Sequence, residues 1–213
     1  MIIETFVCGP LANNCYIIFD EESKKSIIID APPDSLPVVR TYINNNDLSV
    51  EYIILTHGHI DHIAHAEKLR AETKATLLLH EKDHYWIEPP KYMLDLVAGD
   101  YIMFVPDICP KSNEKYFVGK YEFEIIHTPG HTEGGICIYF KDNNLLFSGD
   151  TLFQESIGRT DLYGGSSEIL LKSISEKLLV LPDDTTVYPG HGDETKIKYE
   201  KQYNPFLQNR GIQ

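Results

Sequence analysis

Short apolar runs alternate with polar turns along the first part of the chain. Runs at 5–7, 15–19 and 25–30 have the length of strands, and turn-forming residues separate them. The stretch 34–46 has a helical pattern and ends at three consecutive asparagines, 44–46, which favour the end of a helix. The first part of the chain therefore predicts three strands followed by a helix.

The same kinds of element continue up to residue 118. An apolar run at 51–56 predicts a buried strand, the stretch 61–72 has apolar residues on one helical face, and 75–80 predicts another strand. The segment 81–118 contains four prolines and no sustained period. We expect loop and short helix there, covering one edge of the fold.

The second half begins with a predicted hairpin. Residues 121–128 alternate like a strand, and the apolar runs 135–140 and 144–150 are joined by the turn residues 142–144. Three sequential strands are therefore expected here.

The last elements are a helix and a strand. Residues 167–181 have an amphipathic helical pattern, with Ser166 or Ser167 as the N-cap, and 185–192 reads as a strand and its exit loop. Strands dominate both halves and each half carries helices. This order predicts an α/β fold in which two β-sheets pack face to face with helices outside.

Length and composition place the chain among ordinary globular proteins. It has 213 residues, 42% hydrophobic and 24% charged, which predicts one domain over 1–213. No apolar run reaches the roughly 18–20 residues that cross a bilayer, and the first ten residues have no basic region followed by a long apolar region. We therefore expect a cytoplasmic protein with no membrane partner.

Charge and cysteine content narrow the classes of partner. The net charge of −13 argues against nucleic acid and against an anionic membrane surface, and an anionic substrate would need a local cationic site. The cysteines are scattered without a Cys-x-x-Cys pair, which predicts reduced thiols and neither a zinc finger nor a disulfide framework. They are Cys8, Cys15, Cys109 and Cys137.

The densest chemistry lies in the stretch "THGHIDH", residues 56–62. Three of the nine histidines of the chain fall here, at a connection from a strand to a helix. Imidazole and carboxylate are the usual ligands of zinc and related divalent ions. His57, His59, Asp61 and His62 are more ligands than one tetrahedral site takes from so short a stretch, which favours two adjacent metal ions.

Three later loops supply further ligands. His131 follows the Pro-Gly of "TPGHTEGG", Asp150 ends the strand "LLFSGD", and His191 lies in "VYPGHG". Each follows an apolar strand and lies next to a glycine, which permits close approach of the backbone. Seven ligands, one of them a carboxylate that bridges, complete two four-coordinate sites.

The remaining histidines are interpreted differently. His65 lies in the helix after the cluster, and His80 and His84 lie in a charged stretch. His127 lies on a strand before the Pro-Gly turn and could orient a ligand. We expect structural or surface roles for these four.

The motifs "THGHIDH", "TPGHTEGG", "GDTLF" and "YPGHG" resemble those of the metallo-β-lactamase superfamily, and their order and spacing resemble its glyoxalase II-like branch, the hydroxyacylglutathione hydrolases. The resemblance covers about residues 9–205. It implies a four-layer αβ/βα sandwich with a dinuclear site at one edge. It also implies a hydrolase of thioesters, such as S-lactoylglutathione or a related acyl-thiol, that uses a hydroxide between two metal ions.

The resemblance assigns a role to each ligand. His57, His59 and His131 would bind the first metal ion, whereas Asp61, His62 and His191 would bind the second and Asp150 would bridge them. Zinc is favoured by this ligand set, and iron and manganese are alternatives. Asp61 would also take part in proton transfer, and its presence argues against lactam hydrolysis.

Two departures from the family concern the substrate. Glyoxalase II continues into a C-terminal helical region with basic residues for glutathione, whereas only 22 residues follow His191 here, so much of that region is expected to be absent. Arg159 lies about where the family places a substrate-binding lysine, with Tyr163 close by. We predict that both contact a small-molecule substrate, Arg159 as an anchor for a carboxylate.

Other functions remain open at this point. A persulfide dioxygenase shares the fold and often the sequence "GRTD", present here at 158–161, but it uses a single iron, for which a complete second ligand set would be idle. A nuclease is disfavoured by the net charge, and a non-catalytic binding protein by the intact ligand set. The sequence does not fix the acyl group, the thiol, the metal or the oligomeric state.

Overall fold

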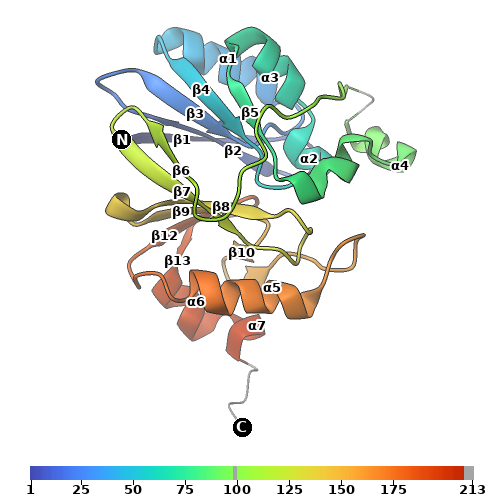
Figure 1. The fold of residues 1–213 in the computed structure, drawn as a ribbon, viewed down its shortest axis with the longest axis vertical. Helices are drawn as coiled ribbons and strands as arrows, with labels where there is room; N and C mark the ends of the chain where they lie inside the picture. The colour runs from blue at the N-terminus through green and yellow to red at the C-terminus, as the bar shows by residue number, and fades with distance from the viewer. Residues whose placement is uncertain (98–99, 209–213) are drawn as a thin grey trace.

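The computed structural model describes residues 1–97 and 100–208, and these form two β-sheets with helices on their outer faces (Figure 1). The first sheet has the strand order β1-β2-β3-β4-β5. Its strands are β1 (Ile2–Cys8), β2 (Asn13–Phe19), β3 (Lys25–Ile29), β4 (Ser49–Ile54) and β5 (Thr76–Leu78). The pairs β1/β2 and β2/β3 are antiparallel, whereas β3/β4 and β4/β5 are parallel, so the sheet is mixed.

The second sheet is also mixed and has the order β13-β12-β9-β8-β7-β6. Its strands are β6 (Lys115–Val118), β7 (Tyr121–His127), β8 (Ile136–Phe140), β9 (Leu145–Gly149), β12 (Thr186–Pro189) and β13 (Thr195–Lys196). β9 and β12 are parallel, and the other neighbours are antiparallel. A separate small hairpin is formed by β10 (Leu152–Phe153) and β11 (Ser156–Ile157).

The helices divide between the two outer faces (Figure 1). Those of the first half are α1 (Ser35–Asn45), α2 (Ile60–Ile63), α3 (Ala66–Thr73), the 3₁₀ segments η1 (Glu81–Ile87) and η2 (Asp95–Val97), and α4 (Lys91–Leu94). Those of the second half are the 3₁₀ turn η3 (Lys141–Asn143), α5 (Ser167–Ser173), its π-helical continuation η4 (Ile174–Leu178), α6 (Ile197–Tyr203) and α7 (Pro205–Gln208). The N-cap of α5 is Ser166, whose hydroxyl oxygen accepts a hydrogen bond from the amide of Ile169.

Alternating side chains on the strands create three apolar layers. Ile28 faces the helices of the first half, whereas its neighbours Ile27 and Ile29 face the second sheet. On the second sheet, Ile138 points inward and Tyr139 packs against the helical side. Apolar layers lie between helix and sheet, between the sheets, and between sheet and helix, which is the expected four-layer αβ/βα sandwich.

The predicted helix over 61–72 is wrong in one respect: it is two helices, α2 and α3, separated at Ala64 and His65. The backbone of Ala31 replaces helical pairing at the break. Its amide donates to the carbonyl of His62 and its carbonyl accepts from the amide of His65, both at 2.8 Å. Ala31 therefore fixes the position of α2 against the end of β3.

The segment 81–118 was expected to be irregular, but it ends in a strand. β6 pairs with β7 through a tight turn in which Gly119 has a φ of +57°. Glycine adopts that conformation readily, and its presence between two alternating segments is the signal for this hairpin. The predicted hairpin of β8 and β9 is confirmed, with Asn144 in the left-handed conformation at its turn.

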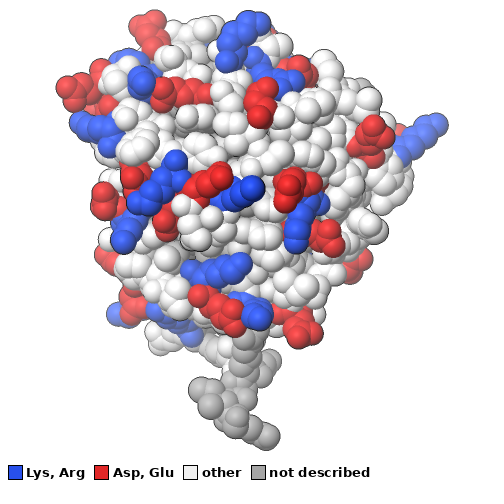
Figure 2. Space-filling view, viewed as in Figure 1, with Lys and Arg blue, Asp and Glu red and all other residues white. Residues whose placement is uncertain are grey.

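Among residues 1–97 and 100–208, no helix combines the length and the apolar character needed to cross a membrane. All four cysteines are free thiols, and only Cys109 is partly exposed. Acidic and basic side chains are interspersed over the face shown in Figure 2.

Candidate metal centre

Four segments that follow strands meet at one edge of the sandwich. His57 and His59 lie in the loop after β4, and Asp61 and His62 lie in α2. The other three ligands, each placed after a strand of the second sheet, are His131, Asp150 and His191. β7, β9 and β12 run in the same direction, so their carboxyl ends reach the same edge. The structure thus brings together all seven predicted ligands.

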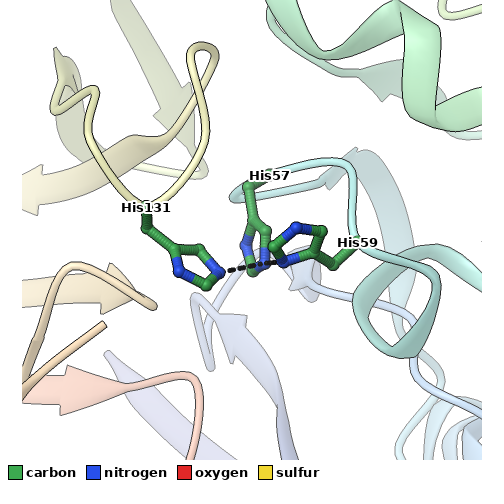
Figure 3. A group of neighbouring side chains, drawn as sticks. All are labelled: His57, His59 and His131. Carbon is green, nitrogen blue, oxygen red and sulfur yellow. Dashed lines mark hydrogen bonds between the residues drawn. The ribbon is translucent and has the colours of Figure 1, made fainter. Parts of the chain in front are cut away.

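The first group contains three histidines from two loops (Figure 3). Nε2 of His57 lies 3.1 Å from Nδ1 of His59 and 3.2 Å from Nε2 of His131. All three side chains are buried. Their ring nitrogens converge on one point.

The second group contains Asp61, His62 and His191. Nε2 of His62 lies 3.3 Å from Nε2 of His191, and Oδ2 of Asp61 lies 3.6 Å from the first and 3.5 Å from the second of these nitrogens. Here too, one atom of each residue faces a common point.

Asp150 lies between the two groups. Its Oδ2 is 3.5 Å from Nε2 of His131, and its Oδ1 is 3.4 Å from Nε2 of His62. Oδ2 also lies 3.5 Å from Nε2 of His191. One carboxylate therefore contacts both groups, which is the geometry of a bridging ligand.

The spacing of these atoms fits divalent cations. Ligands at 2.0–2.2 Å from a tetrahedral ion lie about 3.3–3.6 Å apart, close to the distances in both groups. Oδ1 of Asp150 is buried without a hydrogen-bond partner among the described residues, and it lies 3.4 Å from Nε2 of His62. Since Nδ1 of His62 donates to Asp30, a neutral His62 ring turns the lone pair of Nε2 toward this oxygen, and the two lone pairs repel each other unless a proton or a cation lies between them. A cation between them resolves that repulsion.

Hydrogen bonds fix which nitrogen of His131 and of His191 faces the centre. Nδ1 of His131 lies 2.7 Å from the carbonyl oxygen of Arg159, and Nδ1 of His191 lies 3.0 Å from that of Leu11. Because a carbonyl only accepts, each Nδ1 carries the hydrogen. Nε2 is then left as a ligand atom.

Asp30 orients one histidine in each group. Its Oδ2 accepts from Nδ1 of His62 at 2.8 Å and from the hydroxyl of Thr56 at 2.8 Å. The same hydroxyl accepts from Nδ1 of His57 at 3.1 Å. Asp30 is buried and has a φ of +60°, so the end of β3 adopts an unfavourable backbone conformation where the carboxylate is required.

A second buried carboxylate, Asp83 in η1, joins the two loops of the first group. It accepts from the amide of Gly58 at 2.8 Å, from the hydroxyl of Thr132 at 2.7 Å and from the amide of Gly134 at 2.7 Å. Burial raises the pKa of Asp83, and these three donors oppose the shift. The Asp83 contacts hold the loop of His57 and His59 against the loop of His131.

The loop that carries His191 is tied to β2. The side-chain amide of Asn14 donates to the carbonyl of Pro189 at 3.0 Å and to the carbonyl of Gly192 at 2.9 Å. The backbone amide of Asn14 donates to the carbonyl of Gly190 at 2.8 Å. The neighbouring Asn13 donates to Oδ2 of Asp61 at 2.8 Å. β2 therefore positions ligands from both halves of the chain.

The electrostatics of the centre suit cation binding. Burial and the neighbouring histidines lower the pKa of His57 well below its ordinary value and that of His59 to about 3, so these rings are neutral. Burial opposes ionisation of Asp61 and Asp150, but His62 and the other polar neighbours together outweigh it and lower the pKa of each carboxyl. Burial likewise opposes charge on His62, but Asp150 and its other acidic neighbours raise its pKa. The surroundings that attract a proton to His62 also attract a divalent cation.

A cavity of about 270 Å³ opens beside the centre. It is lined by ligands of both groups, by Arg159 and by the apolar side chains Leu11, Ile60, Tyr92, Met93 and Leu162. Tyr163 is exposed, and its ring packs against Tyr85, 5.0 Å away, rather than lining the cavity. A substrate contact of Arg159 or Tyr163 stays a prediction.

The other four histidines lie outside the ligand groups. His65 accepts from the amide of Leu36 at 3.2 Å, His84 lies 3.5 Å from Cys109, and His80 stacks on His127 with centroids 4.3 Å apart. Nε2 of His127 bonds to the carbonyl of Glu133 at 2.9 Å, which braces the loop that carries His131.

Sequence reasoning did not single out Asn13, Asp30, Thr56 or Asp83. Asp30 has a signal, because it ends an apolar strand as Asp150 does. Asp83 has none, because it lies in a charged stretch and its partners, two backbone amides and one hydroxyl, lie far from it along the chain.

Comparison with known proteins agrees with this geometry. The family model described as "Metallo-beta-lactamase superfamily" matches residues 8–191. The chain belongs to the metallo-β-lactamase superfamily. The hydroxyacylglutathione hydrolase GloC of Haemophilus influenzae is 36% identical over 213 residues, which covers 99% of this chain and 100% of that protein. This similarity confirms the resemblance to the glyoxalase II-like branch.

Two solved structures of this superfamily are similar over nearly the whole chain. The BLEG-1 B3 metallo-β-lactamase is 35% identical with a TM-score of 0.89, covering 97% of this chain and 100% of that one. TTHA1623, solved in a di-iron-bound form, is 30% identical with a TM-score of 0.83, covering 96% of this chain and 100% of that one. The four-layer fold is thus the metallo-β-lactamase fold.

Proposed function

We propose that the protein is a dinuclear metallohydrolase that cleaves small-molecule thioesters, as a hydroxyacylglutathione hydrolase does. The position of Asp150, in contact with both ligand groups, carries this proposal. A carboxylate in this position can contact a cation in each of the two groups. The similarity to the hydroxyacylglutathione hydrolase GloC of Haemophilus influenzae supports the cleavage of thioesters.

Two divalent cations bound at these groups would lower the pKa of water and polarise a carbonyl group. The donor set of five histidines and two aspartates favours zinc, while TTHA1623 shows that a related chain binds iron. We therefore propose two ions per chain, with zinc preferred.

The residues of the chain contribute orientation and proton transfer. Asp61 lines the cavity and is ionised, because His62 and its other partners outweigh the effect of burial on its pKa. Asn13 holds Oδ2 of Asp61 by a 2.8 Å hydrogen bond. Asp61 is thus positioned to accept a proton from water that attacks the thioester carbonyl. The thiolate is a good leaving group and needs little acid assistance.

Lactam hydrolysis is the second candidate, since BLEG-1 is described as a B3 metallo-β-lactamase. Asp61 was expected to disfavour that reaction, and the similarity to BLEG-1 opposes this expectation. A mononuclear iron persulfide dioxygenase is a weaker candidate, because Asp61, His62 and His191 would have no role around a single ion.

The deciding experiment joins metal analysis with a substrate panel. Purified protein loaded with zinc, iron or manganese is given S-lactoylglutathione, a chromogenic cephalosporin and glutathione persulfide. Thiol release from the thioester without oxygen uptake is the expected result. Oxygen uptake with persulfide by the iron form, or cephalosporin cleavage, in the absence of thiol release would overturn the proposal.

A further inference from the structure

The wall of the cavity beyond the ligands is apolar. Ile60 and Met93 are buried, and Leu11 and Tyr92 are exposed at 47% and 66%, so apolar surface runs from the centre out to the rim. Leu162 completes this wall. A substrate that fills the cavity covers these side chains and gains free energy from its apolar parts.

Charge on the rim is balanced. Arg159 is the one Lys or Arg side chain that lines the cavity among residues 1–97 and 100–208. Its guanidinium forms two hydrogen bonds with the carboxylate of Asp161, from Nε to Oδ1 at 2.7 Å and from an Nη to Oδ2 at 2.8 Å. This planar pairing uses the geometry that would otherwise bind a substrate carboxylate.

From the apolar wall and this pair we infer that the cavity selects thioesters with an uncharged thiol, and that Asp161 sets the preference by neutralising Arg159. The inference rests on the proposed thioesterase function and names the substrate class within it. In this inference Arg159 is not a free anchor for a substrate carboxylate, because its charge is neutralised by Asp161.

The physical reason is the competition between two carboxylates for one guanidinium. Arg159 and Asp161 are both exposed, at 62% and 67%, so their pair is weak and a substrate carboxylate is able to displace it. Displacement leaves the charge of Asp161 beside the incoming anion, in a chain of net charge −13. A thioester of an anionic thiol therefore gains little binding free energy from Arg159, whereas a thioester of an uncharged thiol binds without breaking the pair.

The test compares two thioesters with the same butanoyl group, one of uncharged N-acetylcysteamine and one of anionic glutathione. The wild type should cleave the uncharged thioester with a kcat/KM about tenfold higher. Asp161→Asn should raise kcat/KM for the glutathione thioester about threefold to fivefold and change the other less than about twofold. Asp183→Asn is the matched control, because Asp183 pairs with Lys201 and neither lines the cavity. It should leave the ratio of the two kcat/KM values unchanged.

Binding gives a readout that is independent of turnover. Calorimetric titration with the S-butyl thioethers of the two thiols should show tighter binding of the uncharged one and a smaller difference in Asp161→Asn. If the wild type has a higher kcat/KM for the glutathione thioester, the inference is overturned but the proposed function is not. The same holds if Asp161→Asn and Asp183→Asn change the ratio of the two kcat/KM values equally. If neither thioester is cleaved, the proposed function fails. The titration then decides the cavity's preference, and tighter binding of the glutathione thioether overturns it.

Discussion

Oδ2 of Asp30 lies 2.8 Å from Nδ1 of His62, and through Thr56 the same carboxylate also orients His57. Asp30 thus sets the ring orientation of a histidine in each ligand group. Asp30→Asn places an amide where the His62 ring and the Thr56 hydroxyl require an acceptor. We expect metal affinity to fall about 10–100-fold, measured by competition with a chromophoric chelator. Asp142→Asn, on an exposed turn, should bind metal as the wild type does, and unchanged affinity in Asp30→Asn would contradict the assigned role.

Asp83 should matter for stability as well as for metal binding. Asp83→Ala leaves the amides of Gly58 and Gly134 without their acceptor, so the free energy of unfolding should fall by roughly 2–4 kcal/mol. Urea unfolding in the presence of a chelator measures this loss without a contribution from bound metal. Thr132→Val removes one donor only and should cost about 1 kcal/mol. Equal losses for the two variants would show that Asp83 does not join the loops.

Metal stoichiometry separates the bridging ligand from the others. Asp150→Ala should reduce occupancy in both groups, whereas His191→Ala should release one ion and leave the other, because His191 belongs to one group only. Elemental analysis after dialysis measures both. One tightly held ion in the wild type, unaffected by His191→Ala, would rule out the dinuclear assignment.

The stacked pair of His80 and His127 predicts a pH dependence of stability. Burial and the neighbouring His127 lower the pKa of His80 to about 4, and burial lowers that of His127. The unfolded chain, with ordinary histidine pKa values near 6.5, therefore binds more protons than the folded chain between about pH 6.5 and 4. Stability contributed by the neutral pair is present above that window and is lost as the pH falls through it.

The variant His127→Phe keeps an aromatic stack but removes one titrating group. The loss of unfolding free energy between pH 7 and pH 4.5 should therefore be smaller in this variant than in the wild type, by on the order of 1–2 kcal/mol. Urea titrations of both proteins at the two pH values give the difference. Parallel pH curves would show that the pair does not titrate within this window.

The period of apolar residues predicted the correct element wherever burial alone determines whether a segment is a strand or a helix. The runs 15–19 and 25–30 are strands because their alternate residues fill two different apolar layers. Periodicity failed at Ala64 and His65, where hydrogen bonds from Ala31 replace helical ones. Such a tertiary contact has no trace in the local pattern.

The site divides in the same way. The seven ligands were visible because imidazole and carboxylate beside glycine, after an apolar run, form a local signal. Asp83 was not visible, because its role depends on two loops that come together only in the fold. Arg159 could be identified from the sequence as a cation that either binds substrate or forms a surface salt bridge, but the pattern did not identify Asp161, two residues away, as its partner.

The attachment of the His191 loop to β2 has a consequence for the order of events during synthesis. Asn13 and Asn14 leave the ribosome before their partners, Pro189 to Gly192, which lie about 175 residues later in the chain. Until those partners emerge, the second ligand group lacks His191 and the carboxylate of Asp61 lacks the ring that faces it. A nascent chain stalled before residue 189 should thus retain the first ion and fail to retain the second. We therefore expect the second ion to bind only after the loop that follows β12 has been synthesised.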